Sequence, residues 1–157
     1  MTREVVILVA EDDDGHARLI EKNLARAGLT NRIERFADGQ ELLDFLFCAG
    51  NGRHRQSDVA YLLLLDIHMP KVDGIDVLRQ IKADAELRKL PVGVLTTTDD
   101  PREVERCHAL GCSHYLVKPI DYAQFAALIR QLGLFMTLVQ VPQLNGQSLV
   151  SDRPDRR

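Results

Sequence analysis

The sequence lacks several features that would place it in a specialised class. It has no tryptophan, only 5% aromatic residues, and 20 Lys+Arg against 23 Asp+Glu. No stretch approaches the roughly 18 consecutive apolar residues of a membrane span. The slightly acidic balance argues against a nucleic-acid-binding surface, which is normally basic. What is present, 157 residues of which 45% are apolar, is enough for one domain with its own core.

The cysteines and the N-terminal region favour a cytoplasmic location. Cys48, Cys107 and Cys112 are an odd number of thiols, which we interpret as reduced. The first apolar run, residues 5–10, is short and has no small-residue cleavage site, so we predict no signal peptide. Cys107 and Cys112 do not have the usual spacing of paired zinc ligands and are interpreted as core or interface thiols.

Short apolar runs alternate with helical patterns along the chain. The runs predict strands at residues 5–10, 31–36, 61–65, 91–95 and 114–117. Between them, apolar residues recur at helical spacing, with Asp38, Asp100 and Asp121 as predicted N-caps. Residues 50–59 read as a solvated polar loop. Five strands alternating with five helices predict an α/β fold, a doubly wound five-stranded parallel sheet flanked by five helices.

The residues at the predicted strand ends carry the chemistry. These positions hold Glu11, Asp12, Asp13, Asp14, Asp66, Thr96 and Lys118. In such sheets, sites form at the carboxyl ends of the strands. Converging carboxylates require a cation, and oxygen ligands suit Mg²⁺. A carboxylate held on a buried strand can attack phosphorus, while a metal ion, a lysine and a hydroxyl neutralise the phosphoryl oxygens.

These motifs together resemble the receiver domain of two-component response regulators. The residues that carry the resemblance are Glu11-Asp12, the segment from Leu65 to Gly74, Leu95-Thr96-Thr97, and Tyr115-Leu116-Val117-Lys118-Pro119. It covers residues 4–135 and implies a flavodoxin-like fold. We expect a receiver domain with an extended C-terminal arm over residues 4–142, and a disordered tail over 143–157.

The resemblance implies a role for each matched residue. Asp66 would accept a phosphoryl group from a sensor histidine kinase. Mg²⁺ would be held by Glu11, Asp12, Asp66 and the backbone carbonyl of His68. Thr96 and Lys118 would bind the phosphoryl group, and Thr96 and Tyr115 would form the switch that responds to it. The Lys118–Pro119 peptide bond would be cis.

The chain departs from the family pattern beside the phosphoacceptor. Many receivers carry Asn two positions after it, where this chain has His68. Together with Thr98, His68 would flank the route of the hydrolytic water. We therefore expect these two residues to tune the lifetime of the phosphoryl group, with slow autodephosphorylation and no other enzymatic activity.

A narrower resemblance points to stand-alone regulators that serve phytochrome-type histidine kinases. It rests on the long loop before Asp66, the Leu-Thr-Thr-Thr motif, and an apolar C-terminal arm. In that subgroup the last helix and arm build a homodimer, so we predict a dimer interface containing Leu134, Phe135, Leu138, Val139 and Val141. The expected kinase partner is then a bacteriophytochrome, with no nucleic acid or membrane partner.

Three other function classes stay open at this point. A receiver-like scaffold that accepts no phosphate would retain the same fold. A phosphohydrolase with an aspartate nucleophile needs a second Asp two residues after the first, where this chain has His68. A flavodoxin-like cofactor binder needs a hydroxyl- or glycine-rich phosphate loop after the first strand, where this chain has four acids.

Overall fold

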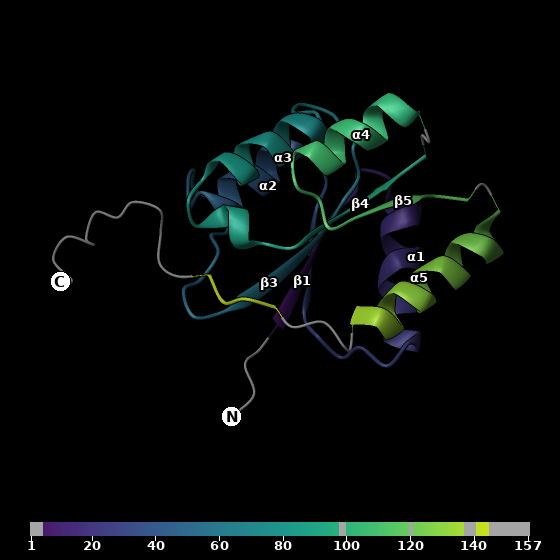
Figure 1. Ribbon diagram of the computed structural model, residues 1–157. Helices are drawn as coiled ribbons and strands as arrows, with labels where there is room; N and C mark the ends of the chain where they lie inside the picture. Colours follow the sequence, from purple (N-terminus) through teal and green to yellow (C-terminus); the bar gives the residue numbers. More distant parts are fainter. Residues whose placement is uncertain (1–4, 98–99, 120, 137–140, 145–157) are drawn as a thin grey trace, which may run out of the picture.

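The computed structural model describes residues 5–97, 100–119, 121–136 and 141–144, and its centre is a parallel sheet (Figure 1). The strands are β1 (Val5–Ala10), β2 (Ile33–Phe36), β3 (Ala60–Leu65), β4 (Val92–Thr96) and β5 (His114–Val117). Their order is β2-β1-β3-β4-β5, and every paired neighbour is parallel. The predicted doubly wound α/β fold is therefore confirmed.

Five α-helices and one 3₁₀ turn connect the strands. They are α1 (Asp14–Arg26), α2 (Gly39–Leu46), α3 (Gly74–Ala83), η1 (Leu87–Lys89), α4 (Pro101–Ala109) and α5 (Tyr122–Met136). An aspartate accepts a hydrogen bond from a backbone N–H at the start of each α-helix; these are Asp13, Asp38, Asp73, Asp100 and Asp121. Such caps satisfy amides that have no partner within the helix. No helix in the described ranges is both long and apolar enough to cross a membrane.

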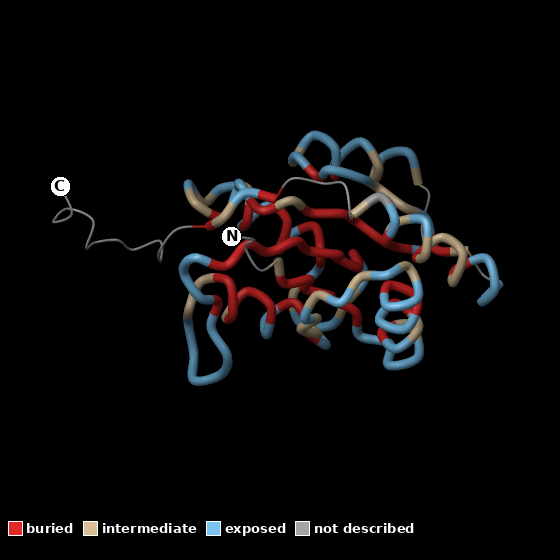
Figure 2. The backbone as a smooth tube through the Cα atoms, turned by 90° about the horizontal axis from the view of Figure 1, so that it is seen from below, coloured by how far each residue is buried: buried red, intermediate tan, exposed pale blue. Residues whose placement is uncertain are grey.

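The two faces of the sheet are covered by different helices, which makes two cores. Side chains alternate along β1, so Val6 and Leu8 pack toward α2, α3 and α4, whereas Ile7 and Val9 pack toward α1 and α5. Buried residues run through the strands, and exposed residues lie on the outer helices (Figure 2). A sheet covered on both faces explains why β1 and β3 are almost continuously apolar.

The carboxyl ends of the strands lie at one edge of the sheet. From β1 the chain crosses to β2 on one side, and the next strand, β3, lies on the other side of β1. The crevice between β1 and β3 is therefore a topological switch point, where ligand sites form in such folds. The loops after β1, β3, β4 and β5 all reach this edge.

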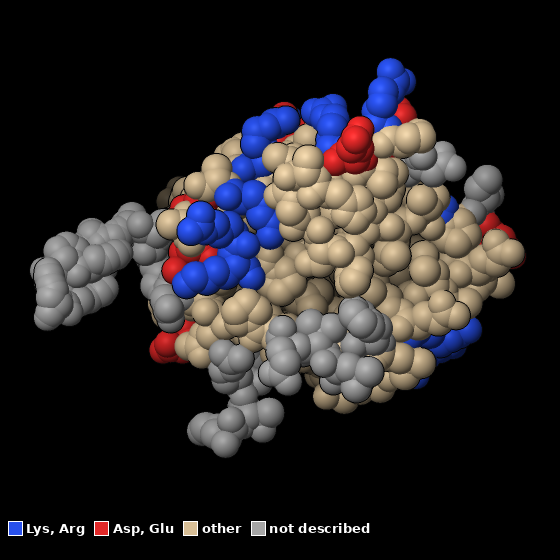
Figure 3. All heavy atoms as spheres, in the orientation of Figure 1, with Lys and Arg blue, Asp and Glu red and all other residues tan. Residues whose placement is uncertain are grey.

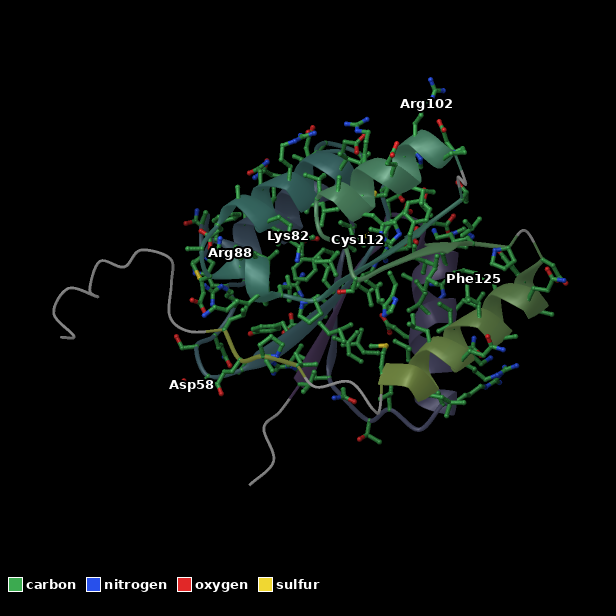
Figure 4. The ribbon with its side chains drawn as sticks, in the orientation of Figure 1. Asp58, Lys82, Arg88, Arg102, Cys112 and Phe125 are labelled. Carbon is green, nitrogen blue, oxygen red and sulfur yellow. The ribbon has the colours of Figure 1, made fainter. Side chains whose placement is uncertain are left out.

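The described segment of residues 141–144 packs on the domain. Val141 is 6% exposed and Leu144 is fully buried, each within one of the two cores. Gln143 pairs with Ala60 in an antiparallel bridge, and its Nε2 donates to Asp58 Oδ1 at 2.9 Å. Asp58 is labelled beside this segment in Figure 4. The core therefore includes Leu144, two residues beyond the predicted boundary at residue 142.

This packing also revises the predicted dimer interface. Val141, which was predicted to lie in the interface, has its apolar side chain covered by the domain's own core. Leu134, by contrast, is 58% exposed. Leu138, Val139 and the side chain of Phe135 lie outside the described part of the chain.

The loop at residues 50–59 was predicted to be solvated, but part of it is buried against the domain. Arg55 is 5% exposed, and its Nε donates to Leu46 O at 2.8 Å. Arg53 lies 4.4 Å from the centre of the Phe36 ring and donates to Glu34 Oε1 at 2.7 Å. The arginine stems cover apolar surface while their charged ends find acceptors, which anchors the loop to α2 and β2.

The packing of the chain end predicts the effect of two leucine substitutions. Leu144→Ala removes a fully buried side chain and should lower the free energy of unfolding by about 2–4 kcal/mol. Leu134→Ala removes an exposed side chain and, at protein concentrations where the chain is monomeric, should change the unfolding free energy by less than about 0.5 kcal/mol. Urea unfolding followed by circular dichroism measures both. Equal effects for the two variants would show that the chain end does not belong to the core.

Candidate functional site

Three carboxylates meet at the switch point. Glu11 and Asp12 follow β1, and Asp66 follows β3; one oxygen from each lies within 4.8 Å of the others. Glu11 is 2% exposed and Asp66 is 6% exposed, whereas Asp12 is at the surface. The sequence-based prediction that these residues form one cluster is confirmed.

Glu11 is held by contacts to both its backbone and its side chain. Its carbonyl oxygen accepts two hydrogen bonds from Arg35 of β2, from Nε at 3.0 Å and from Nη2 at 2.8 Å. Its Oε2 accepts from the backbone N–H of Asp13 at 3.2 Å. Burial disfavours the carboxylate and raises the pKa of Glu11 to about 7, although the hydrogen bond from Lys118 lowers it.

Asp66 lies at the start of a tightly packed loop. Its backbone N–H donates to Ala10 O at 3.0 Å, and its Oδ1 accepts from the backbone N–H of His68 at 3.0 Å. The loop closes where Gly74 N donates to Ile67 O at 2.8 Å. A Cβ at Gly74 would lie 2.5 Å from Ile67 Cα and 2.7 Å from Asp66 O. Only glycine permits this close approach, which fixes the backbone that carries Asp66.

Lys118 brings a buried positive charge to the carboxylates. Its Nζ donates to Glu11 Oε1 at 2.5 Å and to Asp66 Oδ2 at 3.2 Å, and it lies 3.2 Å from His16 Nδ1. Its backbone N–H donates to the carbonyl of Thr96 at 2.7 Å. Thr96 is fully buried at the end of β4. The sheet thus brings both predicted residues to the same edge as the acids.

The predicted cis bond between Lys118 and Pro119 is wrong. The described residues contain no cis peptide bond. The trans isomer is the ordinary one even before proline, by about 0.5–1 kcal/mol. Here Lys118 already reaches Glu11 and Asp66 with a trans bond.

The predicted switch residue contacts α4. The hydroxyl of Tyr115 donates to Glu103 Oε1 at 2.9 Å, and burial together with this contact raises the pKa of Tyr115. The other carboxylate oxygen of Glu103 lies 3.7 Å from His68 Nε2. Glu103 therefore lies between His68, two residues after Asp66, and Tyr115 on β5. Thr98 lies outside the described residues.

Three residues at the site were not identified from the sequence: His16, Arg35 and Glu103. Each belongs to a different element and is polar at a position where polar residues are ordinary. His16 is in the first turn of α1, and Glu103 is in the first turn of α4. Only the strand order and the docking of the helices place them beside the acids, so no local pattern could have found them.

The donor set fits a hard divalent cation. Carboxylate oxygens from Glu11, Asp12 and Asp66 are the ligands that Mg²⁺ prefers, with remaining positions taken by water or a carbonyl. The exposed carboxylate of Asp12 gives the cluster an opening to solvent. An ion bound there would compete with Lys118 for the charge of Glu11 and Asp66.

Comparison with known proteins identifies a family. The sequence model of the family described as the response regulator receiver domain matches residues 7–130 of this chain. The crystal structure of a response regulator receiver domain from Rhodospirillum rubrum is 48% identical, with a TM-score of 0.84 over 90% of this chain and 99% of that one.

Two further relatives are phytochrome-related or metal-bound. Response regulator Rcp1 of Synechocystis is 34% identical over 130 residues, which are 83% of this chain and 87% of Rcp1. The Mn²⁺-bound form of Rcp1 is similar in structure, with a TM-score of 0.77, 28% identity, and coverage of 87% and 98% of the two chains. The phosphorylated cyanobacterial phytochrome response regulator RcpA is 27% identical, with a TM-score of 0.77 over 90% and 99% of the chains.

The buried position of Glu11 predicts a pH-dependent stability. The pKa of Glu11 is raised from the ordinary 4.5 to about 7 in the folded state. The stability that its protonated form contributes to the folded protein is therefore present below pH 4.5 and is lost as the pH rises through 7. Gln mimics the protonated form at every pH. We therefore compare the unfolding free energies in EDTA. The value for Glu11→Gln minus that for the wild type should increase by about 1 kcal/mol or more from about pH 5 to pH 8.

Urea unfolding at several pH values measures this difference. Glu41→Gln, at an exposed carboxylate on α2, is the matched control and should show no such divergence. A constant difference between Glu11→Gln and the wild type across this range would contradict a raised pKa at Glu11.

Proposed function

Because this chain belongs to the response regulator receiver domain family, we propose that it is a stand-alone regulator that accepts a phosphoryl group on Asp66 from a histidine kinase. One observation carries the proposal. The Asp66 carboxylate is buried at a strand end, contacts the Lys118 ammonium at 3.2 Å, and shares a cluster with two more acids. A scaffold would have no need to bury these opposing charges at one sheet edge.

The proposed transfer forms a bond between an Asp66 carboxylate oxygen and phosphorus. The phosphorus–nitrogen bond to the kinase histidine breaks, and the imidazole leaves with the electron pair and takes up a proton. Lys118 and the hydroxyl of Thr96 bind the phosphoryl oxygens. Mg²⁺, held by Glu11, Asp12, Asp66 and the carbonyl of His68, supplies further positive charge when bound. The Mn²⁺-bound form of Rcp1 supports a divalent cation as cofactor.

The phosphorylation signal would pass to the surface through Thr96 and Tyr115. Movement of the Thr96 hydroxyl toward the phosphoryl group makes room beside β4, and Tyr115 turns inward to fill it. The hydrogen bond from Tyr115 to Glu103 breaks in that step. The α4–β5 surface is then the two-state element that phosphorylation biases.

A phytochrome-type kinase is the proposed partner in the cytoplasm. Its support is the likeness to RcpA, a phytochrome response regulator, over almost the whole of both chains. The long loop before β3 adds to this likeness. The chain would act through protein contacts, with slow autodephosphorylation as its own chemistry and no nucleic acid or membrane partner.

Phosphorylation is tested by intact mass after incubation with acetyl phosphate and Mg²⁺. We expect a gain of one phosphoryl group in the wild type, and none in Asp66→Asn or in the presence of EDTA. Asp58→Asn, an exposed aspartate at the opposite end of β3, is the matched control and should behave as the wild type. An equal gain in Asp66→Asn would refute the site, no gain with acetyl phosphate or kinase would favour the scaffold, and continuous phosphate release would favour the phosphohydrolase.

His68 and Thr98 are proposed to set the lifetime of the phosphoryl group. The His68 side chain is 53% exposed and lies two residues after Asp66, where it would flank the route of the hydrolytic water. A smaller side chain admits this water more easily. His68→Asn should therefore speed the decay of the phosphorylated protein by about threefold or more, or about 0.7 kcal/mol in the barrier.

The decay is followed by intact mass after removal of acetyl phosphate. His54→Asn is the control, because His54 lies in the loop before β3 and its ring contacts the carbonyls of Ala49 and Gly50. An unchanged decay rate in His68→Asn would refute the proposed role.

We also propose a homodimer through α5 and the β5 edge. An apolar groove of about 240 Å³ runs between these elements, lined by His114, Leu116, Leu128, Gln131 and Leu132. Leu134 is exposed on the same helix. Figure 3 shows few charged side chains over β5 and α5, whereas Lys and Arg gather over the part of the molecule that contains α3 and η1. An uncharged apolar surface favours association.

Sedimentation equilibrium tests the dimer. The wild type should sediment as a dimer, and Leu134→Glu should weaken it about tenfold or more, because a charge would be buried in the interface. Gln124→Glu, an exposed position near the start of α5, is the control for added charge. A monomeric wild type at high concentration would refute the proposal.

A further inference from the structure

His16 makes a contact with Lys118 that the proposed mechanism does not use. The Lys118 Nζ has three polar neighbours: Glu11 Oε1 at 2.5 Å, Asp66 Oδ2 at 3.2 Å and His16 Nδ1 at 3.2 Å. A lysine ammonium has three protons to donate and no lone pair to accept with. The three neighbours, two carboxyl oxygens and one imidazole nitrogen, therefore match its three protons.

This contact determines the tautomer of the His16 ring. Because the ammonium can only donate, Nδ1 must accept with its lone pair, and the ring proton must be on Nε2. Glu11 Oε2 lies 3.9 Å from Nδ1, beyond hydrogen-bonding distance. The contacts of Nδ1 thus agree with a nitrogen that carries no proton.

The ring is held in place by two elements. The backbone N–H of His16 donates to Asp13 Oδ1 at 2.9 Å, which fixes the first turn of α1. Its ring lies edge-on to Phe125 of α5, with centroids 5.3 Å apart, and to Tyr122, with centroids 6.3 Å apart. Phe125 is labelled on α5 in Figure 4 and is 1% exposed. The Nδ1 lone pair is therefore directed at the pocket by packing between α1 and α5.

We propose that His16 is a positioning residue that orients the Lys118 ammonium for phosphoryl transfer to Asp66. The proposal rests on the proposed function of Asp66. The unequal contacts give the reason: Lys118 is 2.5 Å from Glu11 but 3.2 Å from Asp66. With Glu11 as the stronger attractor, an ammonium without a third partner would move toward Glu11. The third hydrogen bond, donated to His16 in the first turn of α1, restrains the ammonium against this movement and keeps it within reach of Asp66.

A matched pair of variants distinguishes the hydrogen bond that His16 accepts from the packing of its ring. His16→Phe keeps an aromatic ring against Phe125 and Tyr122 but removes the acceptor. His16→Asn loses the ring but keeps an oxygen near the place of Nδ1. With acetyl phosphate and Mg²⁺, phosphorylation of His16→Phe should be about tenfold slower than wild type, as expected for loss of one hydrogen bond to a charged group. His16→Asn should lose less than about threefold.

His16→Phe is then combined with Lys118→Ala, which removes the ammonium. If His16 acts through Lys118, His16→Phe should slow phosphorylation no further in a Lys118→Ala background, because the partner is already gone. An equal slowing in both backgrounds would overturn the proposal, and so would a greater loss in His16→Asn than in His16→Phe.

A second measurement needs neither phosphorylation nor metal. Two-dimensional ¹H–¹⁵N spectra of the imidazole groups at about pH 8, in EDTA, should show His16 with its proton on Nε2 in the wild type. In Lys118→Ala the two tautomers should mix. A proton on Nδ1 in the wild type, or identical spectra for the two proteins, would overturn the proposal. A wild type that gains no phosphoryl group would instead refute the proposed function, whatever these spectra show.

Discussion

The contact between the Lys118 ammonium and two buried carboxylates is the interaction on which the rest of the site depends. Glu11 and Asp66 are almost fully removed from water, and two such charges side by side repel each other strongly. Lys118 comes from β5, two strands away from Asp66 in the sheet order. The charge balance of the pocket therefore requires the whole sheet, and not any single strand with its loop.

The elements around this contact differ in how firmly they are held. Asp66 is fixed by the closed loop that ends at Gly74, and Glu11 is fixed by Arg35 from the neighbouring strand. Tyr115 is partly exposed, and its hydroxyl donates to Glu103 on α4. In the proposed switch, binding energy at the firmly held acidic pocket is used to move this side chain.

Local sequence patterns predicted the elements well, and their errors have physical causes. Strands β1 and β5 begin and end at the predicted residues. Strand β2 begins two residues later than predicted, and Asn31 before it donates from its side chain to the carbonyl of Val5. Strand β4 begins after Pro91, which has no N–H to donate to a neighbouring strand. The sequence did not show that Val141 packs in its own domain, because a run of apolar residues does not say whether its own domain or another chain covers it.

By itself, the sequence determined the alternation of strands and helices, the acids after β1 and β3, the threonine at the end of β4 and the lysine after β5. Periodicity and capping are local properties, and parallel strands bring their carboxyl ends to one edge. Only the tertiary structure decided that Lys118 bridges Glu11 and Asp66, that His16 and Glu103 join the site, and that Val141 and Leu144 close the core. These contacts join residues far apart in the chain, and their distances depend on strand register and helix docking, which no short segment encodes.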